Sequence, residues 1–327
     1  MSGGCTDDFH EELGPITHDP GLGGLPRFLV TGGRGQLATH LGRMARTQAR
    51  AVGREDLDLA EPTSIATALD RYAPEVVINA AAYTDVDGAE SDEDTAREIN
   101  TDGAESLAVA CRDRRIRLIH ISTDYVFSGA VPGGGDPATA PALEPTDPTE
   151  PATAYGRTKL AGERAALAAF PETTIVRTAW LYTGPWRESL GIPGGDFVAT
   201  MSRLESEREG VRVVDDQWGS PTYAPALAGG VLELLQREAG GSIDARGLTL
   251  HAAGEGRATW YELARETFRQ LGADPERVSA CSSDEFPRPA PRPAFSVLST
   301  SAWRELGLAP LEGWRRSLFR QLAPYAP

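Results

Sequence analysis

Tyr155 and Lys159 are the two residues of this sequence whose types and spacing most directly predict chemistry. Residues four apart on a helix lie about 40° apart around the axis and about 6 Å apart along it, so the two side chains share one face. Because a nearby ammonium favours a phenolate, we expect Lys159 to lower the pKa of Tyr155 from about 10 toward neutrality. The pair predicts a tyrosine that donates a proton to a developing alkoxide. The same spacing also occurs by chance in helices, so the prediction depends on its context.

Polar residues end the strand that is predicted just before this helix. The predicted strand 117–122 is followed by Thr123, Asp124 and Tyr125. Open α/β sheets bind ligands at the carboxyl ends of their strands, so Thr123 can offer a hydroxyl that polarises a carbonyl beside Tyr155. Asp124 and Tyr125 are then candidates for substrate contacts. A plain strand-end cap is the weaker alternative for Thr123.

A glycine-rich turn, residues 31–38, lies between the first predicted strand and the first predicted helix. Backbone N–H groups and the helix dipole can hold a pyrophosphate at such a junction. The turn is therefore a candidate for binding a dinucleotide. Alanine replaces the last glycine of the usual fingerprint, so the position of the turn supports this hypothesis more than its glycines do.

The end of the second predicted strand indicates which dinucleotide is bound. Arg54 stands where an acidic residue would engage a ribose 2′-hydroxyl and an arginine would accept a 2′-phosphate. NADPH is therefore favoured, and NADH stays possible because Glu55 lies beside Arg54. Asp58 could reach the adenine, and Ala80 and Ala81 end a strand with side chains small enough for a ligand to approach the backbone.

These candidates need a sheet that brings several strand ends together. The apolar pattern predicts strands at 27–31, 51–53, 76–79, 117–122 and 174–177, and helices at 37–44, 64–72, 95–112 and after Tyr155. This alternation is typical of a doubly wound parallel sheet of the Rossmann type, an α/β fold with helices on both faces. Two segments rich in glycine and proline, 129–151 and 183–195, are predicted to be long loops, which often cover ligands.

The C-terminal part predicts a smaller, mixed α/β lobe that binds substrate. Helices are expected at 224–236 and 259–271, the second opened by a capping box of Thr259 and Glu262, with a strand at 248–251. The prolines of 286–293 exclude a helix there. We expect a disordered tail over 1–25, a dinucleotide-binding domain over 26–180 plus about 220–253, and a substrate lobe over 181–219 plus 254–327.

Composition excludes several classes of protein. The 327 residues carry a net charge of −15, which would repel nucleic acid phosphates. No apolar run is long enough to span a membrane, and no signal peptide opens the chain. Three cysteines without a close pair fit a reduced, cytoplasmic protein. The five histidines lack the spacing of a zinc site, so no metal is predicted.

Six segments, in order, resemble the dTDP-4-dehydrorhamnose reductase family within the extended short-chain dehydrogenases. They are VINAAAYTDVDGAE, HISTDYVFSG, YGRTKLAGE, RTAWLY, DQWGSPT and RPAPRPAFSVL. The resemblance implies an extended short-chain dehydrogenase fold and NADPH-dependent reduction of the C4 ketone of a dTDP-4-keto-6-deoxyhexose in deoxysugar biosynthesis. The sequence leaves open whether the protein is a monomer or a homodimer.

The same resemblance implies roles for individual residues. Thr123, Tyr155 and Lys159 would be catalytic, with Lys159 also holding the nicotinamide ribose. The cofactor would be bound by Gly32, Gly35, Gln36 and Leu37, with Asp58 and Leu59 near the adenine and Ala80, Ala81 and Tyr83 lining the cleft. Trp180 would pack near the sugar, and Arg292 is the candidate for the nucleotide diphosphate. A core aromatic residue and a surface arginine are the alternatives for these two.

Some positions depart from the family pattern and leave the sugar open. The family usually has lysine where Gly88 stands and asparagine where Asp196 stands, and its two long loops are shorter. A related reductase of an antibiotic-sugar pathway, such as a dihydrostreptose synthase, is therefore an alternative. A regulatory subunit that binds a dinucleotide without reducing anything is another, as is an epimerase or dehydratase of the same fold.

Overall fold

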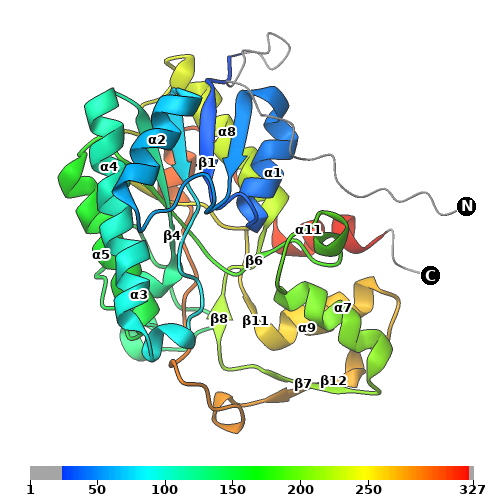
Figure 1. Ribbon diagram of the computed structural model, residues 1–327. Coiled ribbons are helices and arrows are strands. Elements are labelled where there is room, and N and C mark those ends of the chain that lie inside the picture. Colours follow the sequence, from blue (N-terminus) through cyan, green and yellow to red (C-terminus); the bar gives the residue numbers. More distant parts are fainter. Residues whose placement is uncertain (1–23, 324–327) are drawn as a thin grey trace, which may run out of the picture.

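Six parallel strands form the central sheet of the computed structural model, which describes residues 24–323 (Figure 1). Their order is β10-β5-β4-β3-β1-β2. The strands are β1 (Phe28–Thr31), β2 (Ala49–Val52), β3 (Val76–Asn79), β4 (Arg117–Thr123), β5 (Thr174–Thr178) and β10 (Thr249–His251). Every neighbouring pair is parallel. The predicted doubly wound sheet is confirmed, and its strand order reverses between β1 and β3, where such sheets bind ligands.

Helices cover both faces of this sheet, which is why its strands carry apolar residues on both faces. One face carries α1 (Gln36–Ala45) and α8 (Ala224–Ala239), and the other carries α2 (Pro62–Tyr72), α4 (Gly103–Arg114) and α5 (Ala154–Ala169). Phe28 and Val30 of β1 pack in the core beneath α1 and α8, whereas Leu29 packs in the core on the α2 and α4 side. Successive side chains of a strand point to opposite faces, so both faces need apolar residues.

The helical segment that follows β3 is interrupted by a π-helical turn. The helix expected over 95–112 consists of α3 (Glu93–Arg97), a π-helical turn (Glu98–Asp102) and α4. The Asn100 side chain in that turn accepts from the backbone N–H of Tyr83 and donates to the Tyr83 carbonyl. It also donates to the hydroxyl of Thr158 on α5. The π-helical turn therefore ties the segment that follows β3 to the helix that carries Tyr155.

A smaller mixed lobe lies beyond the carboxyl ends of the strands (Figure 1). It contains α7 (Phe197–Glu207), β7 (Val211–Val214), β8 (Trp218–Gly219), β11 (Ala258–Thr259), α9 (Trp260–Gln270) and β12 (Val278–Cys281). Further short elements are β6 (Leu181–Tyr182), α6 (Trp186–Ser189), β9 (Thr222–Tyr223), α10 (Ser301–Glu305) and α11 (Trp314–Leu322). The predicted capping box at the start of α9 is confirmed, with Thr259 and Glu262 each accepting from the other's backbone N–H.

The expected disordered tail lies mostly outside the described residues. Of residues 1–25, Leu25 is described and is only 4% exposed, packed in the core with Phe28. The folded chain therefore begins before residue 26. Within residues 24–323, no helix combines the length and the apolar character that crossing a bilayer requires.

Candidate active site

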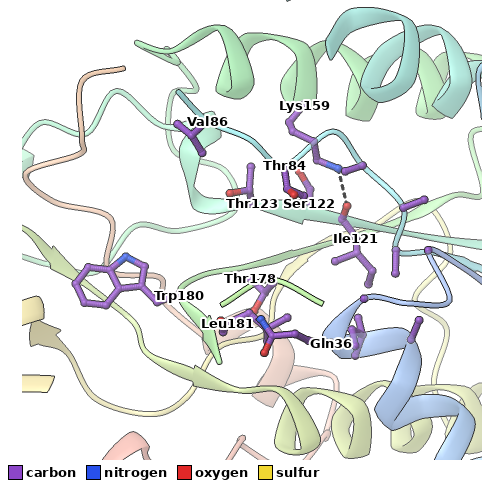
Figure 2. Close-up of a pocket in the computed structure, with 18 of the residues that line it drawn as sticks. Gln36, Thr84, Val86, Ile121, Ser122, Thr123, Lys159, Thr178, Trp180 and Leu181 are labelled. Carbon is purple, nitrogen blue, oxygen red and sulfur yellow. Dashed lines mark hydrogen bonds between the residues drawn. The ribbon is translucent and has the colours of Figure 1, made fainter. Parts of the chain in front are cut away.

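A cavity of about 840 Å³ opens at the carboxyl edge of the sheet and is lined by residues of both lobes (Figure 2). The predicted site residues in its lining are Gly32, Gly35, Gln36, Leu37, Arg54, Ala80, Ala81, Thr123, Asp124, Tyr125, Tyr155, Lys159 and Trp180. The structure thus gathers residues from six separate segments around one space. Asp58, Leu59, Tyr83 and Arg292 do not line it.

The turn between β1 and α1 forms one end of the cavity. Gly32 has φ +71°, and a Cβ there would lie 3.1 Å from the backbone of Ala80 and Ala81. A Cβ on Gly33 would lie 2.8 Å from the backbone of Val52. Gly35 is the N-cap of α1, and no side chain there accepts a hydrogen bond from the first N–H groups of the helix. The first N–H groups of α1 are therefore left to a ligand, and this end of the cavity can bind an anion such as a pyrophosphate.

A buried polar network beneath this turn fixes the end of β3. The Thr31 hydroxyl donates to Asn79 Oδ1 at 2.6 Å and accepts from the backbone N–H groups of Ala80 and Ala81. The Asn79 amide in turn contacts His120 Nδ1 on β4 at 3.1 Å. Because the Thr31, Asn79 and His120 side chains are buried and joined by these hydrogen bonds, the small residues that line the cavity are held in one position.

Two arginines stand where the cavity meets the end of β2. Arg54 lines the cavity, and its Nε lies 2.7 Å from Asp58 Oδ2. Arg34, which sequence reasoning missed, lines the same region and lies 3.4 Å from Glu55. The Arg54 and Arg34 side chains are 74% and 76% exposed, so both ion pairs can open at little cost in free energy when a phosphate approaches. Placing Arg34 here required knowing that the glycine-rich turn faces the end of β2.

Three residues predicted to contact the cofactor are engaged elsewhere. The Asp58 carboxylate accepts hydrogen bonds from the Arg54 side chain and from the backbone N–H of Ala60. Leu59 is buried in the core under α2 and α4. Tyr83 is tied through its backbone to Asn100. None of the three lines the cavity, and their contacts with the cofactor stay predictions.

Tyr155 reaches the cavity because the first turn of α5 packs closely against the end of β4. Thr153 caps the helix by accepting from the N–H of Gly156. A Cβ at Gly156 would overlap the carbonyl oxygen of Tyr125, so only glycine permits this approach. The rings of Tyr125 and Tyr155 then meet edge to face, with centroids 5.5 Å apart. Tyr155 and Thr123 line the cavity together as a result.

Lys159 is buried one turn further along α5. Its Nζ donates to the carbonyl oxygen of Ile121 at 2.9 Å, the contact drawn in Figure 2. Burial lowers the pKa of Lys159 to about 8, against an opposing effect of the Glu163 carboxylate. The ammonium is thus held against β4 while still lining the cavity.

The expected pKa of Tyr155 is corrected by the structure. Burial raises the pKa of Tyr155 to about 12, and the hydrogen bond with Thr123 offsets only part of this rise. The expectation that Lys159 brings it toward neutrality is wrong, because Lys159 donates to Ile121 and burial dominates at Tyr155. A phenol with so high a pKa is protonated at neutral pH, which is the state that a proton donor needs.

Asp124 places a second titratable group beside Thr123. The Thr123 hydroxyl donates to Asp124 Oδ1 at 3.1 Å. Asp124 is only 3% exposed, and burial raises the pKa of its carboxyl group to about 6, against hydrogen bonds that lower it. Thr123 therefore links a buried carboxyl group to the region of the Tyr155 phenol.

Two stacked indoles form the opposite wall. Trp180 has φ +46°, a rare conformation for a bulky residue, and its ring stacks on Trp260 with centroids 3.5 Å apart and planes 5° apart. Phe197 packs against Trp260, with ring centroids 4.6 Å apart, and Gly219 leaves room for the Trp180 ring, which a Cβ there would overlap. Sequence reasoning identified Trp180 and missed Trp260, which also lines the cavity.

Arg292 lies outside the cavity in an ion pair. Its Nη2 donates to Asp87 Oδ2 at 2.7 Å, and Nη1 donates to the carbonyl of Ala290. The pair joins the loop after β3 to the proline-rich C-terminal segment. Arg292 therefore does not line the cavity, and its contact with a nucleotide diphosphate stays a prediction.

Several buried polar atoms of the lining have no hydrogen-bond partner among the described residues. They are Gln36 Oε1, Ser122 Oγ, Asp124 Oδ2, Thr178 Oγ1 and Arg187 Nε. Unpaired buried polar groups are costly, so their concentration around one space indicates a polar ligand. A dinucleotide fits this lining, because it offers phosphates to the turn and hydroxyls and an amide to the strand ends. Within residues 24–323, no three acidic, histidine or cysteine side chains are grouped as metal ligands.

Comparison with known proteins finds the same fold and related reductases. A family model described as the RmlD substrate binding domain matches residues 26–326. A dTDP-4-dehydrorhamnose reductase of Mycobacterium tuberculosis is 48% identical over 300 residues, 91% of this chain and 92% of that protein. A dTDP-4-keto-6-deoxy-D-glucose reductase of Streptomyces niveus is 44% identical, over 89% of this chain and 95% of that protein. The crystal structure of dTDP-4-dehydrorhamnose reductase from Bacillus anthracis in complex with NADP has a TM-score of 0.80 at 31% identity, over 92% of this chain and 99% of that one.

Proposed function

This chain belongs to the family of the RmlD substrate binding domain and of dTDP-4-dehydrorhamnose reductases, and on that premise we propose that it reduces the C4 ketone of a dTDP-4-keto-6-deoxyhexose with NADPH. The resemblance seen in the sequence is confirmed by the family match. The observation that carries the proposal is the joining of Tyr155, Lys159 and Thr123 with the glycine-rich turn around a single cavity. The reaction serves deoxysugar biosynthesis.

Tyr155 is the proton donor in this proposal. NADPH, when bound, supplies the hydride to the sugar carbonyl carbon. The buried phenol of Tyr155 remains protonated at neutral pH, since burial raises its pKa to about 12, and it gives its proton to the carbonyl oxygen as negative charge develops there. In the ligand-free protein the Thr123 hydroxyl donates to Asp124 Oδ1 at 3.1 Å, and it orients the carbonyl oxygen by turning its hydrogen to that oxygen when the ketone binds.

The remaining lining residues bind and position the two ligands. Lys159, fixed by the Ile121 carbonyl, holds the nicotinamide ribose. The N-terminus of α1 holds the dinucleotide pyrophosphate, and Arg34 and Arg54 accept the 2′-phosphate that distinguishes NADPH from NADH. Trp180, stacked on Trp260, gives the sugar a flat apolar wall. Asp124 and Tyr125 contact the substrate from the end of β4.

The two lobes divide these tasks in the proposal. Residues 26–180 and about 220–253 bind the dinucleotide, supported by the place of β10 at the edge of the central sheet and of α8 against α1. Residues 181–219 and 254–327 bind the nucleotide sugar. The proposed enzyme works in the cytoplasm as a monomer or homodimer, which light scattering of the purified protein distinguishes.

The test is to incubate the protein with NADPH and a panel of dTDP-4-keto-6-deoxy sugars while following absorbance of the reduced nicotinamide. One mole of NADPH oxidised per mole of sugar reduced supports the proposal, and the sugar that reacts fastest identifies the pathway. Binding of NADPH without turnover of any sugar would instead support a regulatory subunit. Conversion of a sugar with no net oxidation of NADPH would support an epimerase or a dehydratase.

A further inference from the structure

The proposed function leaves one of the two diphosphates in the site without an assigned cation. Two diphosphates must be bound, one in NADPH and one in the dTDP-sugar, and the N-terminus of α1 accounts for one of them. Arg292 is bound to Asp87 outside the cavity. Of the cations that line the cavity, Lys159 donates to the Ile121 carbonyl, and Arg34 and Arg54 are largely exposed beside β2.

Arg187 is the remaining cation of the lining, and it is buried. It stands on α6, within the loop 183–195, and its side chain is 7% exposed. Nη1 lies 3.3 Å from Asp196 Oδ2, and Nη2 donates to the carbonyl of Pro193. Nε has no partner among residues 24–323, and Arg187 lines both the active-site cavity and a second cavity behind the loop.

We propose that Arg187 binds a diphosphate group in the active-site cavity, an inference that rests on the proposed reduction of a nucleotide sugar with NADPH. An arginine stays protonated even when buried, so its charge needs an anion nearby. Asp196 supplies that anion, but its Oδ2 is shared with the backbone N–H groups of Thr183 and Gly184, and Nε is left without an acceptor. A diphosphate supplies the acceptor that Nε lacks.

The loop is built to hold Arg187 in place before any ligand arrives. At one end, the Gln321 amide of α11 donates to the carbonyl of Thr183, and the indole of Trp186 donates to the carbonyl of Gln321. At the other end, Asp196 caps α7 by accepting from the N–H of Ala199. Positive φ angles at Gly191 and Gly194 turn the chain back between these anchors. A cation fixed in this way loses little freedom on binding.

Arg187→Met is the variant that tests the proposal, and Arg117→Met is its matched control. Arg117 is also mostly buried and ion-paired, with Glu238, but it lies at the opposite edge of the sheet. The affinities to measure by calorimetry are those for dTDP, for thymidine, which lacks the diphosphate, and for NADPH. Thermal unfolding of each variant shows how much of any change comes from loss of structure.

The arms of the experiment distinguish the source of the diphosphate. If Arg187 binds the substrate diphosphate, Arg187→Met weakens dTDP binding roughly ten- to hundredfold and leaves thymidine and NADPH unchanged. If Arg187 binds the cofactor diphosphate, only the affinity for NADPH weakens, by a similar factor. Arg117→Met leaves all three affinities at the wild-type value. Unchanged affinity for both dTDP and NADPH in Arg187→Met overturns the proposal.

Asp196→Asn separates ligand binding from a purely structural role. The asparagine keeps an acceptor for the cap of α7 but removes the charge that faces Arg187. If Arg187 binds a diphosphate, this variant keeps most of the affinity that Arg187→Met loses. Equal losses in both variants mean that the ion pair only supports the loop, which overturns the proposal. Wild-type protein that binds NADPH but no dTDP contradicts the proposed function itself.

Discussion

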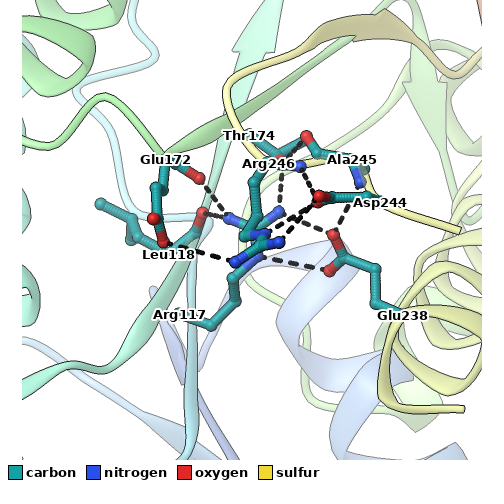
Figure 3. Close-up of polar contacts among 8 residues, drawn as sticks. All are labelled: Arg117, Leu118, Glu172, Thr174, Glu238, Asp244, Ala245 and Arg246. Carbon is teal, nitrogen blue, oxygen red and sulfur yellow. Dashed lines mark hydrogen bonds and ion pairs between the residues drawn. The ribbon is translucent and has the colours of Figure 1, made fainter. Parts of the chain in front are cut away.

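The two edges of the central sheet carry similar polar residues and use them in opposite ways. At the amino edge, where β4 and β5 begin, the Arg117 guanidinium donates to the Glu238 carboxylate and to Thr174 Oγ1 (Figure 3). It also donates to the carbonyls of Leu118 and Glu172. Every interaction of this group is made within the protein, so the cluster stabilises the fold and has nothing left for a ligand.

At the carboxyl edge, three polar atoms at the ends of β4 and β5 are buried and left unpaired. Ser122 Oγ, Asp124 Oδ2 and Thr178 Oγ1 have no partner among the described residues, and all three line the cavity. A buried polar group is stable only if something pairs with it, so these atoms are directed at what the cavity binds. Burial of a polar side chain therefore says little about its role until its partners are counted.

The strongest test of this comparison is Tyr155→Phe. Loss of the proton donor should lower kcat by about 10²- to 10⁴-fold. NADPH affinity should stay near wild type, because the change removes a single oxygen beside the substrate. Steady-state kinetics and NADPH fluorescence titration measure the two quantities.

Arg117→Met provides the contrast from the amino edge. It should lower the free energy of unfolding by about 2–3 kcal/mol, because it leaves the partly buried Glu238 without its cation. Its kcat should match that of the wild type at a temperature where both are folded. A kcat that falls as far as in Tyr155→Phe would break the distinction between the two edges.

The free energy of unfolding should depend on pH with opposite signs at Asp124 of the carboxyl edge and Asp244 of the amino edge. Burial raises the pKa of Asp124 to about 6, compared with about 3.9 in an unfolded chain. The folded protein then binds more protons than the unfolded chain between these values, so the free energy of unfolding falls as pH rises from about 4 to 6. Asp124→Asn should remove this fall, which amounts to about 2–3 kcal/mol.

At the amino edge the sign reverses. The Arg246 side chain, through its hydrogen bond, holds the pKa of Asp244 below its usual range. Asp244 therefore contributes stability that is present at neutral pH and lost as the solution is made acidic. Urea unfolding at a series of pH values from about 2 to 7 checks both signs, because the Asp124 effect falls between about pH 4 and 6 and the Asp244 effect below about pH 4. An Asp124→Asn protein whose stability still falls between pH 4 and 6 would contradict the assignment.

The sequence predicted the parts of the site that depend on local pattern. Periodicity and helix geometry were enough to place Tyr155 and Lys159 on one helix face and the glycine-rich turn between β1 and α1. Thr178 could have been found by the same logic that found Thr123, because both end predicted strands at one sheet edge.

The sequence could not predict features that depend on distant contacts. The pKa of Tyr155 is raised by burial, which only tertiary packing creates. Arg292 is bound by Asp87, which lies 205 residues away in the chain. Trp260 reaches the cavity by stacking on Trp180, across two segments with no shared pattern. A local pattern therefore locates a strand end or a helix face but does not determine which partner a side chain finds there.

A matched pair of substitutions on β5 should give the smallest effects of these predictions. The pair compares the two edges within one strand, because Thr174 begins β5 at the amino edge and Thr178 ends it at the cavity. Thr174 Oγ1 accepts from Arg117 and donates to the Ala245 carbonyl, so Thr174→Val should lower the free energy of unfolding by about 1–3 kcal/mol. Thr178 Oγ1 has no partner in the described chain. Thr178→Val should therefore change the stability of the ligand-free protein by less than about 0.5 kcal/mol, while NADPH or substrate affinity weakens by up to about tenfold.

Urea unfolding of both variants, with and without NADPH, measures this difference directly. Thr174→Val should lower stability equally in the two conditions, because its partners are all within the protein. Thr178→Val should match the wild type without ligand and gain less stability than the wild type when ligand is added. If Thr178→Val instead destabilises the free protein as much as Thr174→Val does, its hydroxyl is paired within the fold, and unpaired polar atoms are no guide to the ligand at this edge.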